Sequence, residues 1–155
     1  MRVLWMALLL SLFAVTTHAE EWHGQARIVD GDTLAMGPTH FRLISMDAPE
    51  GKQKCYDPNH AEYDCGKNAT RQLEKLIDGR DVTCAGGKRD RYGRSLVVCF
   101  AGDVNLNAEM VRSGWAVSYL GHDFDREEAE AREAKRGLWA GEFKRPADWR
   151  KNHEN

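Results

Sequence analysis

The sequence lacks the patterns that most directly identify zinc, redox and polyanion-binding proteins. Its four cysteines are separated by 9, 18 and 14 residues, so they form neither the close pairs of a zinc ribbon nor a C-x-x-C redox motif. Its histidines show no metal-ligand spacing, and no internal repeat is present. The formal net charge of −2 disfavours passive nucleic-acid binding, because nonspecific affinity comes mainly from neutralised phosphates. Any nucleic-acid site must therefore be a local cationic patch.

Long apolar runs are absent after the N-terminus, and the one run found there is short. Residues 3–15 are apolar, Arg2 precedes them, and residues 17–19 have a small-x-small pattern. A membrane-spanning helix needs roughly 20 apolar residues. The pattern therefore predicts a secretory signal peptide over residues 1–19, cleaved after Ala19, rather than a membrane anchor. We expect the mature chain to be secreted or periplasmic, free of the membrane and, by default, monomeric.

An oxidising compartment would allow the even number of cysteines to form disulfides. Three connectivities are possible, and the local one is favoured, in which Cys55 pairs with Cys65 and Cys84 with Cys99. The first pair would close a loop and the second would join two adjacent strands, each contributing up to about 3 kcal/mol by chain entropy. We interpret both as structural.

Turn residues and hydrophobic spacing predict a small barrel. Strand-like runs separated by glycine-containing turns occupy residues 25–46, which is typical of consecutive β-hairpins. Apolar residues at helical spacing between Ala69 and Ile77 predict an amphipathic helix. Further strands are expected over residues 80–85, 95–101 and 115–119, and further helices near Met110 and over residues 125–135. This order favours an α+β fold, a five-stranded OB-type β-barrel with about three α-helices.

The domain limits follow from these elements. Residues 20–140 are assigned to the barrel domain. Within it, residues 48–66 show no periodicity and are expected to form an irregular loop closed by the first disulfide. Residues 141–155 also lack a period, so we expect a tail that wraps the surface and frays at its end.

Acidic residues lie near the ends of the strand-like runs. Asp32 belongs to the turn Asp30-Gly31-Asp32, and Asp47 comes just after the third predicted strand. In a tight barrel these ends can be neighbours, and carboxylates suit Ca²⁺ or Mg²⁺, with Asp30 behind the direct ligands. The alternative is that Asp-Gly-Asp is turn chemistry alone. Glu50 could orient or deprotonate an attacking water, although a solvated loop glutamate would give the same pattern.

Arg42 and Arg94 are the phosphate-binding candidates, because a planar guanidinium binds phosphate oxygens through two hydrogen bonds. Arg42 lies in a largely apolar strand, where an unpaired charge is costly, so the alternative is an internal ion pair with an aspartate. Arg94 ends a basic connection that could instead be a solvated loop. For either arginine, stabilisation of phosphate charge is the expected role, since a guanidinium keeps its proton above a pKa of about 12.

Tyr92, Tyr119 and Arg91 are assigned to substrate binding. The two tyrosines could stack on bases, as aromatic residues do in single-strand binding sites. The alternative is that they are tyrosines at the edge of the core.

Four ordered motifs closely resemble the staphylococcal nuclease (thermonuclease) family. They are Val-Asp-Gly-Asp-Thr at residues 29–33, Phe-Arg-Leu-Ile-x-x-Asp-Ala-Pro-Glu at 41–50, Asp-Arg-Tyr-Gly-Arg at 90–94 and Val-Arg-Ser-Gly at 111–114. Ala-Lys-Arg-Gly-Leu-Trp at residues 134–139 is similar to the secreted bacterial members of that family. The resemblance spans about residues 22–140.

The resemblance implies an OB-type barrel and a Ca²⁺-dependent endonuclease that acts on DNA and RNA and leaves 3′-phosphate ends. By motif position, Asp32 and Asp47 match the calcium carboxylates. Arg42 and Arg94 match the phosphate-binding arginines, and Glu50 matches the candidate general base.

Two positions depart from the family pattern. The residue after the second aspartate is usually threonine and here is Ala48. It is expected to bind calcium through its backbone carbonyl, so the site should persist with an altered affinity. Tyr119 matches the nucleotide-stacking tyrosine only if one residue is deleted after Gly114.

The leading hypothesis is a secreted or periplasmic phosphodiesterase of low sequence specificity. The main alternative is a non-catalytic nucleic-acid-binding OB-type domain, in which degenerate catalytic positions would be expected. A third is an envelope domain whose acidic surface meets a protein partner, which only the net charge favours.

Overall fold

The computed structural model describes residues 19–153, so the predicted signal peptide lies, apart from Ala19, outside the described residues. The strands are β1 Glu20–Gly24, β2 Arg27–Ile28, β3 Thr33–Met36, β4 Thr39–Leu43, β5 Met46–Asp47, β6 Cys55–Tyr56, β7 Glu62–Tyr63, β8 Val82–Arg89, β9 Ser95–Ala101, β10 Val104–Asn105 and β11 Val117–Ser118. The helices are α1 Cys65–Ile77, α2 Leu106–Arg112, α3 Asp125–Glu133, the 3-10 helix η1 Gly137–Ala140 and α4 Pro146–Lys151. None of the helices within residues 19–153 is long and apolar enough to cross a membrane.

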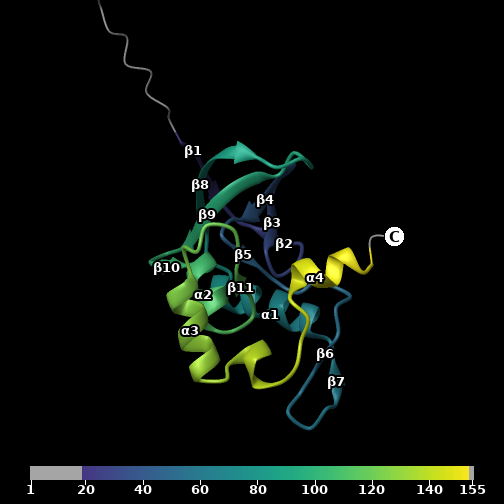
Figure 1. Ribbon diagram of the computed structural model, residues 1–155. Helices are drawn as coiled ribbons and strands as arrows, with labels where there is room; N and C mark the ends of the chain where they lie inside the picture. Colours follow the sequence, from purple (N-terminus) through teal and green to yellow (C-terminus); the bar gives the residue numbers. More distant parts are fainter. Residues whose placement is uncertain (1–18, 154–155) are drawn as a thin grey trace, which may run out of the picture.

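The main sheet has the strand order β1-β8-β9-β4-β3-β2, with β10 paired to β9. Its neighbours are antiparallel except for β4 and β9, which run parallel. Figure 1 shows the sheet curled on itself, with α1, α2 and α3 gathered at one end. The predicted α+β class and OB-type architecture are confirmed.

The described chain differs from the expected elements in three places. Its main sheet has seven strands rather than the expected five. Residues 48–66 contain the short hairpin β6–β7, and residues 146–151 form α4, so the described chain has four α-helices rather than about three. Pro146 is the first residue of α4, where its fixed φ and missing N–H are compatible with the first helical turn. This helix places a tail residue in the site described below.

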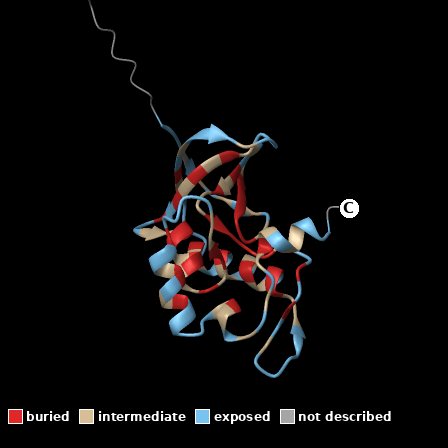
Figure 2. Cartoon of the chain, viewed as in Figure 1, coloured by how far each residue is buried: buried red, intermediate tan, exposed pale blue. Residues whose placement is uncertain are grey.

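The core forms where the curled sheet meets α1. Phe41 and Leu43 in β4 are fully buried, and Arg42 between them faces the other side of the strand. Ala69, Leu73 and Ile77 fall four residues apart on the inner face of α1 and are also buried. Figure 2 shows these buried segments where sheet and helices meet. The packing holds the β2–β3 turn and the end of β4 in fixed positions beside α1.

The cysteine pairing favoured from the sequence is confirmed. Cys55 is bonded to Cys65, which joins β6 to the first residue of α1. Cys84 is bonded to Cys99 across directly opposed positions of β8 and β9. All four side chains are buried, and the structure has no free cysteine among residues 19–153.

Replacing Cys84 and Cys99 together by alanine is expected to lower the free energy of unfolding by about 3 kcal/mol, because a loop of about 15 residues is no longer closed in the unfolded chain. Urea unfolding under oxidising conditions measures the change. An unchanged unfolding midpoint would show that the bond adds nothing to a hairpin already stabilised by its strand pairing.

Candidate active site

The turn before β3 places Asp32 in the interior. The Asp32 carbonyl accepts a hydrogen bond from the Leu43 amide of β4 at 2.9 Å, and the Asp30 carboxylate accepts one from the Asp32 amide at 3.1 Å. Gly31 packs so tightly that an added Cβ would lie 2.8 Å from the Cβ atoms of Ala48 and Ala69. Asp-Gly-Asp is therefore a turn whose glycine permits close packing on α1, and this packing directs Asp32 inward.

Asp47 enters the same region from β5. This short strand pairs with β11, so that Asp47 lies opposite Val117, and its side chain has no exposed surface. Ser45, with a φ of 61°, reverses the chain between β4 and β5. The proximity of Asp32 and Asp47 expected from their positions at strand ends is thus formed by the turn after β4.

Arg42 joins the two aspartates. Its Nη1 donates to Oδ1 of Asp32, and its Nη2 donates to Oδ1 of Asp47 at 2.7 Å. The internal ion pair considered as the alternative role for Arg42 is therefore present, and it involves both aspartates. Burial opposes the charge of Arg42, but the two carboxylates raise its pKa overall. A positive charge between two buried carboxylates is the central electrostatic feature of the site.

The Asp32 carboxylate has further donors. The Thr33 hydroxyl donates to its Oδ1 at 3.1 Å, and the Ala48 amide donates to its Oδ2 at 3.0 Å. Burial nevertheless raises the pKa of Asp32 to about 7, and the charges of Asp30 and Asp47 add to the rise against the opposing charge of Arg42. Burial thus disfavours the charged form of Asp32, although Arg42 and the Ala48 amide favour it.

In calcium-free buffer, the contribution of Asp32 to the free energy of unfolding is expected to fall as pH rises from 3.8 to about 7. The sign follows because the unfolded carboxyl loses its proton near 3.8, whereas the folded carboxyl keeps it up to about 7, so the folded chain binds more protons in this window. Denaturant unfolding of wild type and of Asp32→Asn at a series of pH values isolates this contribution. Equal pH slopes for the two proteins would contradict it.

Glu50 is held by the loop that follows β5. The backbone amide of Glu50 donates to the side-chain Oε1 of Gln53 at 3.2 Å. The backbone amide of Gln53 donates to the Glu50 carbonyl at 2.7 Å. Gly66 in α1 packs on this carbonyl, since an added Cβ would lie 1.9 Å from it. The Glu50 side chain keeps 32% of its surface exposed. Its backbone is fixed while its carboxylate remains accessible.

Arg150 of α4 is a site residue that the sequence did not reveal. Its Nη1 donates to Oδ1 of Asp47 at 2.9 Å and to Oε1 of Glu50 at 2.8 Å, and its Nη2 donates to Oδ2 of Asp47 at 3.0 Å. The only local signal was a helix start at Pro146 followed by an arginine one turn later. No periodicity predicts a contact across 103 positions.

Arg94 lies on the β8–β9 hairpin rather than among these carboxylates. Its Nε donates to Oδ2 of Asp90 at 2.7 Å, and its guanidinium lies 5.3 Å from the ring centre of Tyr92. Arg91 also lies beside Tyr92, whose side chain is largely exposed. Among the described residues, the side-chain hydrogen bonds of Arg94 go to Asp90 alone. The hairpin residues therefore form a separate cationic and aromatic group.

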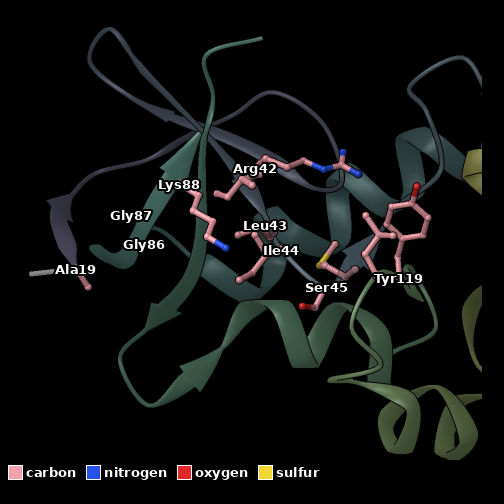
Figure 3. A pocket seen from close by; sticks show the side chains of 12 residues that line it. Ala19, Arg42, Leu43, Ile44, Ser45, Gly86, Gly87, Lys88 and Tyr119 are labelled. Atoms are coloured by element: carbon pink, nitrogen blue, oxygen red, sulfur yellow. The ribbon is translucent and has the colours of Figure 1, made fainter. Parts of the chain in front are cut away.

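Arg42 lines a pocket of about 960 Å³, whereas Asp32, Asp47 and Glu50 are not among its lining residues. Leu43, Ile44 and Leu96 supply apolar wall, while Lys88 and Tyr119 lie toward its two ends. Figure 3 shows the Arg42 guanidinium directed toward the side of the pocket where Tyr119 lies. Apolar walls with a few cationic and aromatic groups suit a ligand with a flat ring and an anionic group.

The donors around Arg42 suit a hard cation. Asp32 and Asp47 offer carboxylate oxygens, and Ala48 lies directly beside Asp47 in the chain. Within residues 19–153 no three acidic, histidine or cysteine side chains form a ready metal cluster. Calcium would therefore take its remaining ligands from backbone carbonyls and water, which it commonly does. The residues present fit calcium with two protein carboxylates.

Comparison with known proteins gives a family and several relatives. The model of the family described as "Staphylococcal nuclease homologue" matches residues 40–141. An uncharacterized endonuclease of Escherichia coli O157:H7 is 35% identical over 146 residues, covering 88% of this chain and 89% of that protein. The micrococcal nuclease of Shigella flexneri is 33% identical over 149 residues, covering 83% and 80%.

A third relative has a different kind of name. The succinoglycan biosynthesis protein ExoI of Rhizobium meliloti is 40% identical over 101 residues, covering 64% of this chain and 53% of that protein. The family model covers the segment in which Arg42, Asp47 and Glu50 lie. The chain belongs to the staphylococcal nuclease family.

Proposed function

We propose that the chain is a secreted, calcium-dependent endonuclease that hydrolyses the phosphodiester bonds of DNA and RNA with low sequence specificity. The convergence of two buried carboxylates, Asp32 and Asp47, on the guanidinium of Arg42 beside a pocket carries the proposal. Metal-assisted hydrolysis of phosphodiesters uses carboxylates to hold the cation and cationic groups to stabilise the phosphate. The names of two relatives, an endonuclease and a micrococcal nuclease, support the same activity.

Calcium would be held by Asp32, Asp47 and the backbone carbonyl of Ala48. Asp30 would support these ligands without binding the cation directly. Bound there, calcium would polarise the phosphate and lower the pKa of a water. The burial that raises the pKa of Asp32 supports this role, because a buried acid gains more from a nearby cation than an exposed one.

The chain's own residues divide the remaining chemistry. Glu50 accepts a proton from the attacking water as the water oxygen bonds to phosphorus. The bond from phosphorus to the 5′ oxygen breaks, the leaving oxygen takes a proton from solvent, and the phosphate stays on the 3′ side. Arg42 stabilises the charge that builds on the phosphate oxygens, and Arg94 does the same once its guanidinium leaves Asp90.

The pocket supplies substrate contacts without base discrimination. Tyr119 provides a ring for stacking, and Lys88 provides a charge for a neighbouring phosphate. Tyr92 and Arg91 extend this surface at the hairpin. Stacking tolerates every base, so these contacts support low specificity and action on both DNA and RNA.

Two bonded cysteine pairs support an oxidising location, as does the leader pattern of residues 1–19. The mature enzyme would therefore act outside the cytoplasm, and we propose that it acts as a monomer.

Oxidised residues 20–155 are expected to cut single-stranded DNA, double-stranded DNA and RNA with calcium, and to stop when a chelator is added. Gel analysis of the products measures this. Binding without cutting would instead support a non-catalytic nucleic-acid-binding domain. A chelator-independent rate would refute the assigned roles of Asp32 and Asp47.

A further inference from the structure

The C-terminal helix places a second guanidinium on the carboxylates of the site. Arg150 binds both oxygens of Asp47 and one oxygen of Glu50, at 2.8 to 3.0 Å. Its side chain keeps 25% of its surface exposed, whereas Asp47 keeps none. Exposed ion pairs contribute little, but hydrogen bonds to a buried charge from a planar fork are strong and geometrically specific. Arg150 is therefore not an incidental surface contact.

The segment before α4 is anchored independently of this contact. Tyr56 and Glu142 exchange two backbone hydrogen bonds of 2.9 Å, and Gln53 Nε2 donates to the Lys144 carbonyl at 2.8 Å. Gln53 is buried and also binds the Glu50 amide, so one side chain connects the Glu50 loop to the tail. Arg150 is thus presented to Glu50 and Asp47 by a fixed segment, which lowers the entropy cost of its contacts.

The hydrogen bonds of Asp47 limit what can bind there simultaneously. Each oxygen of a carboxylate accepts about two hydrogen bonds, and Oδ1 of Asp47 already accepts one from Arg42 and one from Arg150. A cation that binds Oδ1 of Asp47 therefore takes a position that a guanidinium N–H group uses, and one that binds both oxygens crowds the Arg150 bond to Oδ2 as well. When an N–H group of Arg150 is displaced in this way, the Arg150 side chain is still paired with Glu50, the proposed water-activating carboxylate.

We propose that Arg150 is a third phosphate-binding arginine of the site, which exchanges part of its contact with Asp47 for a phosphate oxygen of the substrate. The proposal rests on the proposed nuclease function and adds to it a residue from the C-terminal tail. In this role Arg150 competes with calcium for Asp47 and also aids the reaction. Loss of Arg150 must tighten calcium binding and slow cleavage together.

Arg150→Ala tests this, with Arg150→Lys keeping the charge but not the planar fork. Lys151→Ala is the matched control, since Lys151 lies on the same helix, is largely exposed and pairs with Asp148. For Arg150→Ala we expect kcat on single-stranded DNA to fall about tenfold to a hundredfold, as for loss of a charged hydrogen bond. Calorimetry should show tighter calcium binding, and millimolar methylguanidinium should restore part of kcat. Arg150→Lys should be intermediate and Lys151→Ala unchanged.

Two combinations of results would overturn the proposal. Tighter calcium binding with faster cleavage would mean that Arg150 inhibits the enzyme. A lower thermal unfolding midpoint with weaker calcium binding and no rescue by methylguanidinium would mean that Arg150 only stabilises the fold.

Binding of thymidine 5′-phosphate with calcium provides a readout that does not depend on cleavage. Arg150→Ala should raise the dissociation constant about tenfold, as for one lost charged hydrogen bond, while Lys151→Ala leaves it unchanged. Equal affinities in wild type and Arg150→Ala would refute the assignment to phosphate. Absence of DNA cleavage by wild type would instead refute the proposed nuclease function and leave this binding comparison valid.

Discussion

Glu50→Gln is expected to lower kcat by about 10²- to 10⁴-fold, the usual contribution of a general base. Glutamine keeps the size of the side chain and an oxygen that can still accept the Arg150 hydrogen bond, but it cannot take a proton from water at neutral pH. The Glu50 backbone should remain in place, because its amide and carbonyl are bonded to Gln53. KM should change much less than kcat. Steady-state cleavage of a short single-stranded DNA measures both constants.

Glu142→Gln is the matched control for this variant. Glu142 has 71% of its side-chain surface exposed and lies beside His60, while its backbone is bonded to Tyr56. Its loss of charge should leave kcat unchanged. Activity of Glu50→Gln within a factor of about two of wild type would assign proton removal to another group, since a positioned base contributes at least about 10²-fold.

Arg42→Met is expected to have the second large effect, this time on stability as well as rate. Methionine can fill much of the space of the arginine stem, but it leaves Asp32 and Asp47 buried without the charge that joins them. Removing one partner from a buried ion pair costs about 3–5 kcal/mol. Urea unfolding in calcium-free buffer should show a loss of this size. Loss of the guanidinium should also slow cleavage about 10²- to 10³-fold, as for an oxyanion-hole donor.

Calcium distinguishes the two effects of Arg42→Met. A ligand that binds only the folded chain stabilises it, so calcium should restore part of the lost free energy of unfolding by replacing the missing positive charge. It should not restore the rate. Arg71→Met provides the control, because Arg71 is exposed on α1 and hydrogen-bonds Asn68. An Arg42→Met protein as stable as Arg71→Met would contradict the view that Arg42 neutralises two buried acids.

The Asp30-Gly31-Asp32 turn illustrates how far local sequence is informative. Aspartate and glycine favour turns, so a turn between two strands was predictable from residue preferences alone. That this glycine packs so closely that an added Cβ would lie 2.8 Å from Ala48 and Ala69 was not predictable, because this depends on how closely α1 packs against the turn. The same packing turns a surface-type motif into a buried carboxylate with a raised pKa.

Arg42 and Arg94 illustrate the opposite limit. Both were candidates because of their neighbours in sequence, and the alternatives were an internal ion pair with an aspartate for Arg42 and a solvated basic loop for Arg94. The structure pairs Arg42 with Asp32 and Asp47, and Arg94 with Asp90. Which acid an arginine meets depends on strand pairing and hairpin geometry, which residue type does not specify. Their roles toward phosphate stay predictions for the cleavage and binding measurements.

The sequence by itself determined the fold class and the set of acids and arginines available for chemistry, and it favoured the cysteine pairing that the structure has. These depend on short-range periodicity, turn residues and ordered motifs, all of which are local properties of the chain. Only the tertiary structure decided that Asp32 and Asp47 share one guanidinium, and that Arg150 of α4 reaches Asp47 and Glu50 across about 100 positions. Side-chain contacts at that separation arise from packing of the tail on the Glu50 loop, and no local pattern encodes them.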